Sequence, residues 1–283
     1  MTTSQTFTAT AAGAVWTDVI SHIGTVNVTV DPTLTHAVVT VSTGDDEGPL
    51  ADAVRAARKS EKTYQNLECI TVRVPKVQGN TMTMGNVSFN GGSVVVGQNF
   101  GVVTGSVTGV TVSNGDVIIG GRTVVSNGRV VAEQGTVVSG GGTGTITVDV
   151  KLPSDLSSVR LETTSADLTV DGDLQVLDVH SISGDVEAHG VHTLRGSTTS
   201  GDFEVGRVDA RVDVTSVSGG IEIGAYSGVE FRATSVSGDI RLSATPAATG
   251  SVDANTVSGD VTTYGTAHLC ERVNTVSGRH RSR

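Results

Sequence analysis

The second half of the chain repeats one pattern of apolar and polar positions around a Ser-Gly-Asp motif. The serine of the motif recurs every 17 to 21 residues, and in most copies an apolar residue stands three and five positions after it. Because alternate residues lie on one side of a β-strand, each copy predicts a short strand with one buried face. The serines are Ser165, Ser183, Ser200, Ser218, Ser237, Ser258 and Ser277.

Two further apolar columns accompany the motif. One stands directly before the serine, and we expect it inside the fold; its members are Ile182, Val217, Val236, Val257 and Val276. The other is an alternating pair later in the coil, which predicts a second strand; its members are Leu177/Val179, Val212/Val214, Val229/Phe231 and Val252/Ala254. One coil cannot bury these residues by itself, but stacked coils form a continuous core.

A fixed period of this length is typical of a solenoid. We therefore predict an all-β fold, a β-solenoid or β-helix with coils of about 18–19 residues and a right-handed winding. At the corner of each coil we expect the glycine to provide a positive φ or a tight bend, and the aspartate to accept backbone N–H groups. The structural residues of the repeat are Ser183, Gly184, Ser200, Gly201, Ser218, Gly219, Ser237, Gly238, Ser258 and Gly259.

Residues 1–75 predict strands and one helix that start or cap the solenoid. Residues 25–30 and 37–41 alternate as strands do, with a turn at Asp31-Pro32 between them. Acidic residues and Pro49 precede an apolar stripe that predicts a short helix at about 50–62. A strand at 69–74 follows and stops at Pro75.

Residues 76–145 predict a separate insertion, rich in Gly, Val and Asn and poor in charge. Asn90-Gly91, Asn114-Gly115 and Asn127-Gly128 are hairpin signals, so we expect β-structure and a tendency to self-association here. Residues 146–283 form the Ser-Gly-Asp solenoid, and we expect the basic tail at 279–283 to fray.

Charge and composition limit the kinds of partner and compartment that we expect for this chain. The net charge of −10 disfavours nucleic acid and anionic membrane surfaces. Cys69 and Cys270, the two cysteines of the 283 residues, predict small buried side chains without a disulfide framework. No secretory signal and no apolar run of membrane-spanning length is seen, so we expect a cytoplasmic protein without membrane insertion, with surface exposure as the alternative.

The aspartate column is the main candidate for chemistry. Stacked carboxylates are compatible with a calcium ladder or with the acid pair of a glycoside hydrolase, but repeated capping of a repeated turn is the favoured interpretation. The weak metal candidates are Asp185, Asp202, Asp239 and Asp260. His180, His189 and His192 are the one local histidine cluster; we favour solvent-exposed loop residues over a zinc site. We predict no catalytic residue, no cofactor and no metal.

The run from Ile146 to Gly278, a Val-x-Leu-Pro entry followed by Ser-Val-Ser-Gly-Asp-Ile units, resembles a bacterial β-strand-repeat family named "putative adhesin", a domain of unknown function. The resemblance implies a β-solenoid similar in architecture to the bactofilin scaffolds, and it implies no catalytic residues.

The function predicted is a non-enzymatic structural or binding scaffold that self-associates, as a homo-oligomer or head to tail, or docks a protein partner. A surface or secreted adhesion module is the first alternative. A carbohydrate-active β-helix enzyme is the second, and carbohydrate is therefore kept as a candidate ligand; loss of glycan cleavage on substitution of Asp185 or Asp202 would favour it.

Overall fold

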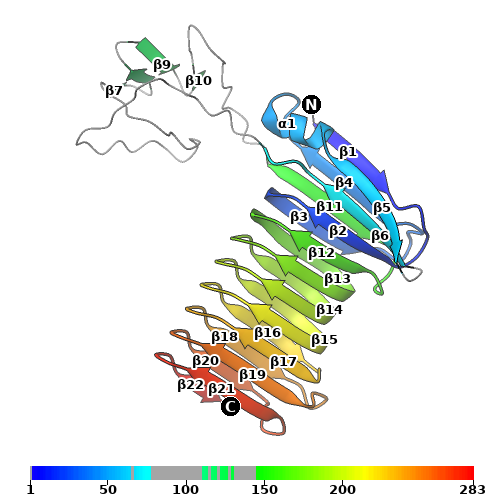
Figure 1. Ribbon diagram of the computed structural model, residues 1–283, viewed down its shortest axis with the longest axis vertical. Coiled ribbons are helices and arrows are strands. Elements are labelled where there is room, and N and C mark those ends of the chain that lie inside the picture. The colour runs from blue at the N-terminus through cyan, green and yellow to red at the C-terminus, as the bar shows by residue number, and fades with distance from the viewer. Residues whose placement is uncertain are drawn as a thin grey trace.

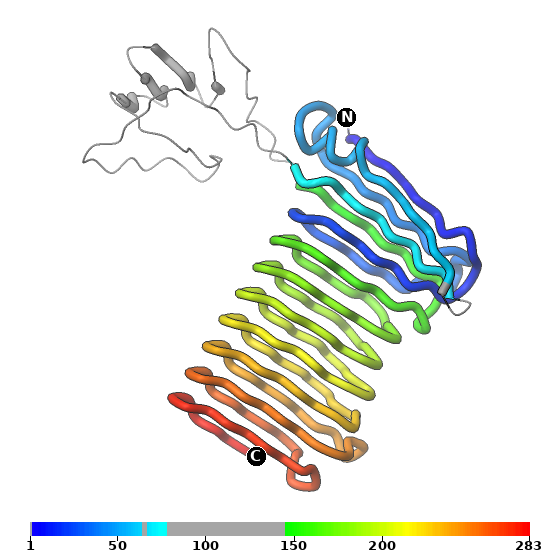
Figure 2. Tube along the Cα trace, in the orientation of Figure 1, coloured from blue at the N-terminus to red at the C-terminus, as the bar shows by residue number. Residues whose placement is uncertain are grey.

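The computed structural model describes residues 2–64, 67–77 and 145–283, and four short strands between residues 110 and 130. Most of these residues form a β-solenoid whose flattened coils lie one below another (Figures 1 and 2). Successive coils pair in parallel through backbone hydrogen bonds along both broad sides. The predicted all-β solenoid is therefore confirmed.

The first broad side, called here the motif face, carries the strands that follow the Ser-Gly-Asp motif. In order down the stack it contains β1 (Thr3–Thr8), β4 (Val38–Thr43), β11 (Ile146–Leu152), β3 (Ile23–Val30), the first parts of β13 (Ser165–His180), β14 (Val186–Ser197) and β15 (Phe203–Thr215), then β16 (Ile221–Tyr226), β18 (Ile240–Ala244), β20 (Val261–Tyr264) and β22 (His280–Ser282).

The second broad side, the opposite face, returns the chain to the next coil. It contains β5 (Arg58–Tyr64), β6 (Leu67–Arg73), β2 (Val15–Ile20), β12 (Ser158–Glu162), the second parts of β13 to β15, and then β17 (Glu230–Thr234), β19 (Ser251–Thr256) and β21 (Cys270–Thr275). In β13 the passage from one face to the other falls at Gly172, whose φ is 107°.

The core lies between the two faces. The columns three and five positions after the motif serine are buried in every coil, as predicted, from Leu168 and Val170 in β13 to Val261 and Thr263 in β20. The predicted second pair is buried at Leu177/Val179, Val212/Val214 and Val252/Ala254. In the remaining coil the pair is Phe231 with Ala233, because Val229 precedes β17 and is 60% exposed.

The apolar column directly before the serine was expected in the core, and this prediction is wrong. Its members are exposed: Ile182 by 54%, Val217 by 45%, Val236 by 46%, Val257 by 47% and Val276 by 80%. They stand at the outer corner, where the strand is interrupted before the motif glycine. The column is therefore a stripe of β-branched side chains along the edge of the solenoid.

The N-terminal strands continue the same sheet. Strand β11 lies between β4 and β3, so residues on both sides of the 76–145 region pair directly. Helix α1 (Pro49–Arg55) packs on β1 and β4 at the end of the stack, with Ala51, Ala53 and Val54 buried. The helix predicted at about 50–62 is thus too long: residues 58–64 form β5, because antiparallel pairing with β6 outweighs the local helical pattern.

The C-terminal residues also differ from expectation. The tail at 279–283 does not fray, since β22 pairs with β20 and the backbone N–H of Arg283 donates to the carbonyl of Thr263. Both cysteines are free, as predicted, but Cys270 is exposed and Cys69 only half-buried, so neither is the small buried residue expected. No helix among the described residues is long and apolar enough to cross a membrane.

Within the 76–145 region, four strands form a separate antiparallel sheet: β7 (Val110–Ser113), β8 (Asp116–Ile119), β9 (Arg122–Ser126) and β10 (Arg129–Val130). The pairs Ser113/Asp116 and Ser126/Arg129 flank the predicted turns at 114–115 and 127–128, which confirms the two hairpins. The third hairpin signal, Asn90-Gly91, lies outside the described residues, and self-association of this stretch stays a prediction.

Candidate functional site

The first hydroxyl residue of each motif ties its own corner together. In the coil of Gly219, the Oγ of Ser216 accepts the backbone N–H of the glycine at 2.8 Å, and Ser216 is 1% exposed. Seven coils repeat this bond. The hydroxyl residues are Thr163, Ser181, Thr198, Ser216, Ser235, Thr256 and Thr275. Each bond satisfies a backbone donor that the corner leaves without a strand partner.

The second serine ties each corner to the previous coil. The backbone N–H of Ser218 donates to the carbonyl of Thr199 at 2.8 Å, and its Oγ donates to the same oxygen at 3.3 Å. The same carbonyl receives both donors in the coils of Ser183, Ser200, Ser237 and Ser258. These serines are exposed, so water can replace the hydroxyl bond but not the backbone bond.

The aspartate column connects each coil to the next one. Oδ1 of Asp185 accepts the backbone N–H of Asp202 at 2.9 Å, and Oδ1 of Asp239 accepts that of Asp260 at 2.8 Å. The predicted capping role is therefore confirmed, but the N–H that is capped belongs to the following coil. One oxygen of each weak metal candidate is used in this way, including Asp202 and Asp260. No group of three metal-ligating side chains occurs in the part of the chain that the structure describes.

The motif glycine is required by close contact between coils. Of the two expected reasons, a positive φ or a tight bend, the first is wrong: none of the motif glycines is among the residues with left-handed backbone. A Cβ on Gly219 would lie 1.9 Å from the carbonyl oxygen of Gly201. The same distance separates a Cβ on Gly238 from the carbonyl of Gly219. Stacked corners therefore approach so closely that only a hydrogen fits.

We expect removal of the first hydroxyl to destabilise the fold far more than removal of the second. Ser216→Ala leaves the buried N–H of Gly219 unpaired, so we expect a loss of about 1–2 kcal/mol in the free energy of unfolding. Ser218→Ala, two residues away and exposed, should change it by less than about 0.5 kcal/mol. Urea unfolding of both variants checks this; equal losses would contradict the assignment of the two hydroxyls.

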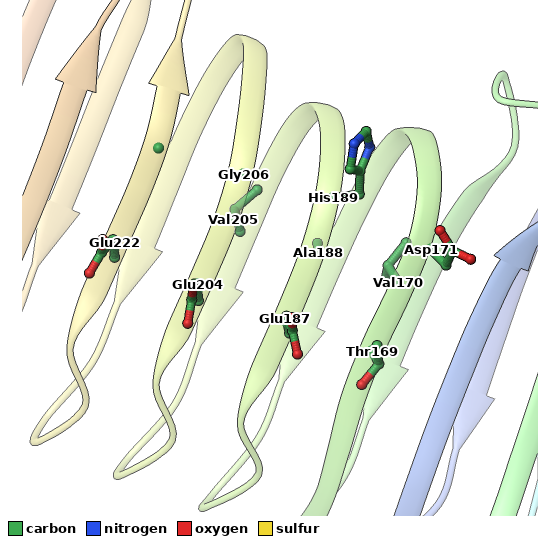
Figure 3. Close-up of a pocket in the computed structure, with 11 residues that line it drawn as sticks. Thr169, Val170, Asp171, Glu187, Ala188, His189, Glu204, Val205, Gly206 and Glu222 are labelled. Carbon is green, nitrogen blue, oxygen red and sulfur yellow. The ribbon is translucent and has the colours of Figure 1, made fainter.

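The motif face holds a shallow depression of about 550 Å³ across β13 to β16 (Figure 3). Glu187, Glu204 and Glu222 stand in register on successive strands, with their carboxylates side by side. Gly206 and Gly224 lie beside them and leave the floor bare of side chains. Two unit charges about 5 Å apart in water repel by about 0.8 kcal/mol before salt screening, so the stacked glutamates oppose one another.

Charge on the motif face is divided between two halves. Across β13 to β16 the columns two, four and six positions after the motif serine carry no lysine or arginine; their acidic residues are Asp167, Asp171, Asp185, Glu187, Asp202, Glu204 and Glu222. Across β18 to β22 the same columns carry four arginines, Arg241, Arg279, Arg281 and Arg283, and two acids, Asp239 and Asp260. We call these the acidic half and the basic half.

The opposite face distributes its charge differently. One column alternates in sign through eight consecutive coils: Asp18, Arg160, Asp178, Arg195, Asp213, Arg232, Asp253 and Arg272. Each charge from Arg160 to Asp253 therefore has an opposite neighbour above and below within its own chain, and cross-strand pairs of this kind stabilise a sheet. The field of this column cancels over a short distance.

Comparison with protein-family models identifies the family of the chain. A family model described as Toastrack DUF4097 matches residues 33–278. The chain belongs to the Toastrack DUF4097 family. This confirms the resemblance inferred from the repeat, while the likeness to bactofilins stays a prediction.

Solved structures similar to this Toastrack chain include two bacterial crystal structures. A "putative adhesin" from Bacteroides fragilis is 13% identical, with a TM-score of 0.48 over 99% of this chain and 97% of that one. A second, from Parabacteroides merdae, is 9% identical, with a TM-score of 0.43 over 100% of this chain and 96% of that one. None of the curated proteins compared with the chain matches it.

The remaining residues of this Toastrack chain that were candidates for metal binding or catalysis do not form one site. His180, His189 and His192 are exposed, as expected, but they lie on strands β13 and β14 and not in loops. His189 and Arg207 both contact Asp173, whose hydrogen bond raises the pKa of Arg207. Burial raises the pKa of the Cys69 thiol, which disfavours a thiolate nucleophile there.

The sequence analysis did not identify the charged columns of the two faces. The glutamates of the motif face stand four residues after the motif serine, and its arginines stand two, four or six residues after it. From Arg160 onward, the alternating column stands five residues before the motif serine. The signal was therefore present in the same alignment that revealed the aspartates.

Proposed function

We propose that the protein is a non-enzymatic scaffold, a rigid solenoid that offers its motif face to a protein partner. The observation that carries this is the contrast between the two faces. The opposite face balances its charges rung by rung within the chain, whereas the motif face keeps three glutamates stacked with like charges adjacent. An arrangement that opposes folding of the isolated chain is typical of a surface selected for binding.

The bonding of the recurring polar groups of the repeat supports the same proposal. The hydroxyls and aspartates of the motif hold backbone groups of the same or adjacent coils, as at Ser216, Ser218 and Asp202. Asp185 and Asp202, the pair considered for glycan cleavage, share this bonding with Asp239 and Asp260. Tyr226 is fully buried against Phe231, so its ring is not accessible for stacking on a sugar.

Site-specific photocrosslinking in the producing cell tests the proposal. A benzophenone side chain in place of Glu204, on the motif face, should give protease-sensitive adducts, because a docked protein would lie over it. The matched control places the same group at Asp213, which is equally exposed on the opposite face, and should give few or none. No protein adduct from Glu204, or adducts sensitive to glycosidases in place of proteases, would overturn the proposal.

A further inference from the structure

The division of charge on the motif face identifies what can cover it. From the acidic and basic halves we propose that the face is self-complementary and binds a second copy of this chain, side by side with the two solenoids antiparallel. This rests on the proposed function and names the partner of the same face. A symmetric dimer uses one surface patch twice, so a single chain must carry both signs, as this face does.

The antiparallel arrangement follows from the order of the charged coils. A two-fold axis lying in the face and running between β16 and β18 reverses the stack and brings β14, β15 and β16 each opposite a strand of the basic half. Strand β16 then faces β18 of the second copy, so Glu222 lies opposite Arg241. Strand β14 faces β22, so Glu187 lies opposite Arg281. Parallel solenoids would place acidic half against acidic half, which repulsion disfavours.

The free side chains support this assignment. Glu187 and Glu204 make no ion pair with the described residues, and neither do Arg281 and Arg283. Arg241 contacts Glu222 and Asp239, both at the boundary between the halves, where the two signs meet within one chain. Glu187 and Arg281, on strands away from that boundary, are therefore charges that a second copy would neutralise.

The size of the motif face determines how tightly the proposed dimer is expected to bind. Seven rungs about 4.8 Å apart, with five residues of about 3.3 Å each, give a face of roughly 30 by 17 Å. Two such faces bury on the order of 1,000 Å², which is at the low end for specific interfaces. The dimer should therefore be weak, rapidly reversible and sensitive to salt.

Sedimentation of the full chain over a range of concentrations tests the proposal. We expect a monomer–dimer equilibrium at about 0.02 M salt that weakens at least about tenfold at about 0.5 M. Glu187→Arg/Glu204→Arg places an arginine opposite Arg281 of the second copy, and Arg281→Glu/Arg283→Glu places a glutamate opposite Glu187. Each variant alone should dimerise at least about tenfold more weakly than the parent, because its faces repel.

Mixing provides the decisive measurement. The two face variants together should form a heterodimer, since Glu187→Arg of one then lies opposite Arg281→Glu of the other, and the unchanged Arg281 and Glu187 meet in the second contact. The control Asp155→Arg/Glu162→Arg changes the net charge by the same amount as Glu187→Arg/Glu204→Arg, but at exposed residues away from the motif face. It should dimerise at least as well as the parent. The proposal is overturned if the parent stays monomeric at low salt, if the face variants dimerise like the control, or if mixing gives no heterodimer. A monomer that still crosslinks another protein through position 204 would reject the second copy and leave the scaffold proposal standing.

Discussion

Gly219→Ala should unfold the solenoid more readily than any other single substitution considered for this chain. The new Cβ would lie 1.9 Å from the carbonyl oxygen of Gly201, and both atoms belong to backbone that hydrogen bonds fix on either side. Neither corner can move without breaking pairs in the coils above and below. We expect a loss of about 4 kcal/mol or more in the free energy of unfolding, and a melting temperature lower by roughly 10 °C.

The adjacent residue provides the control for this prediction. A Cβ on Gly220 would meet nothing closer than 3.6 Å, and its φ lies outside the left-handed region. Gly220→Ala should therefore be close to neutral, and the smaller freedom of the unfolded chain could offset any loss. Calorimetry of both variants distinguishes the two positions. If Gly219→Ala melts with the parent, the close stacking of the corners is contradicted.

The contrast explains which features of the fold could be predicted from sequence. Period and alternation are local signals, so the coil length and the buried columns of Leu168 and Val170 follow from them. The reason for the glycine is not local. It depends on a carbonyl about eighteen residues earlier, whereas the turn-based interpretation offered only a positive φ, which the glycine does not have, or a tight bend.

The misplaced apolar column has a related cause. Val257 stands four positions before Val261, an even spacing, so an unbroken strand would put both on one side. The motif corner interrupts the strand between them and resets the alternation. The same limit applied at residues 58–64, where pairing with β6, a contact made through the tertiary fold, replaced the end of the predicted helix.

The candidate site was predictable only in part. The aspartate column was found because it belongs to the motif, and its capping role was inferred correctly. The segregation of charge was missed because it requires knowing that Glu204 and Arg241 share one face, whereas Arg195 and Asp213 share the other. That assignment depends on how two strands of each coil are folded back, which a list of columns does not contain.

The corrected position of the apolar column leads to a second large expected effect, using one substitution at two places in one coil. Val261 is fully buried beneath β18 and β22, whereas Val257 is 47% exposed at the corner. Val261→Ala removes two buried methyl groups and leaves a cavity, so we expect the free energy of unfolding to fall by about 2–3 kcal/mol. Val257→Ala should lower it by less than about 0.5 kcal/mol. Chemical unfolding at low protein concentration and high salt, where the proposed dimer is dissociated, measures both. Equal losses would show that the corner stripe is packed as tightly as the core, and the exposure assigned to Val217, Val236 and Val257 would then be wrong.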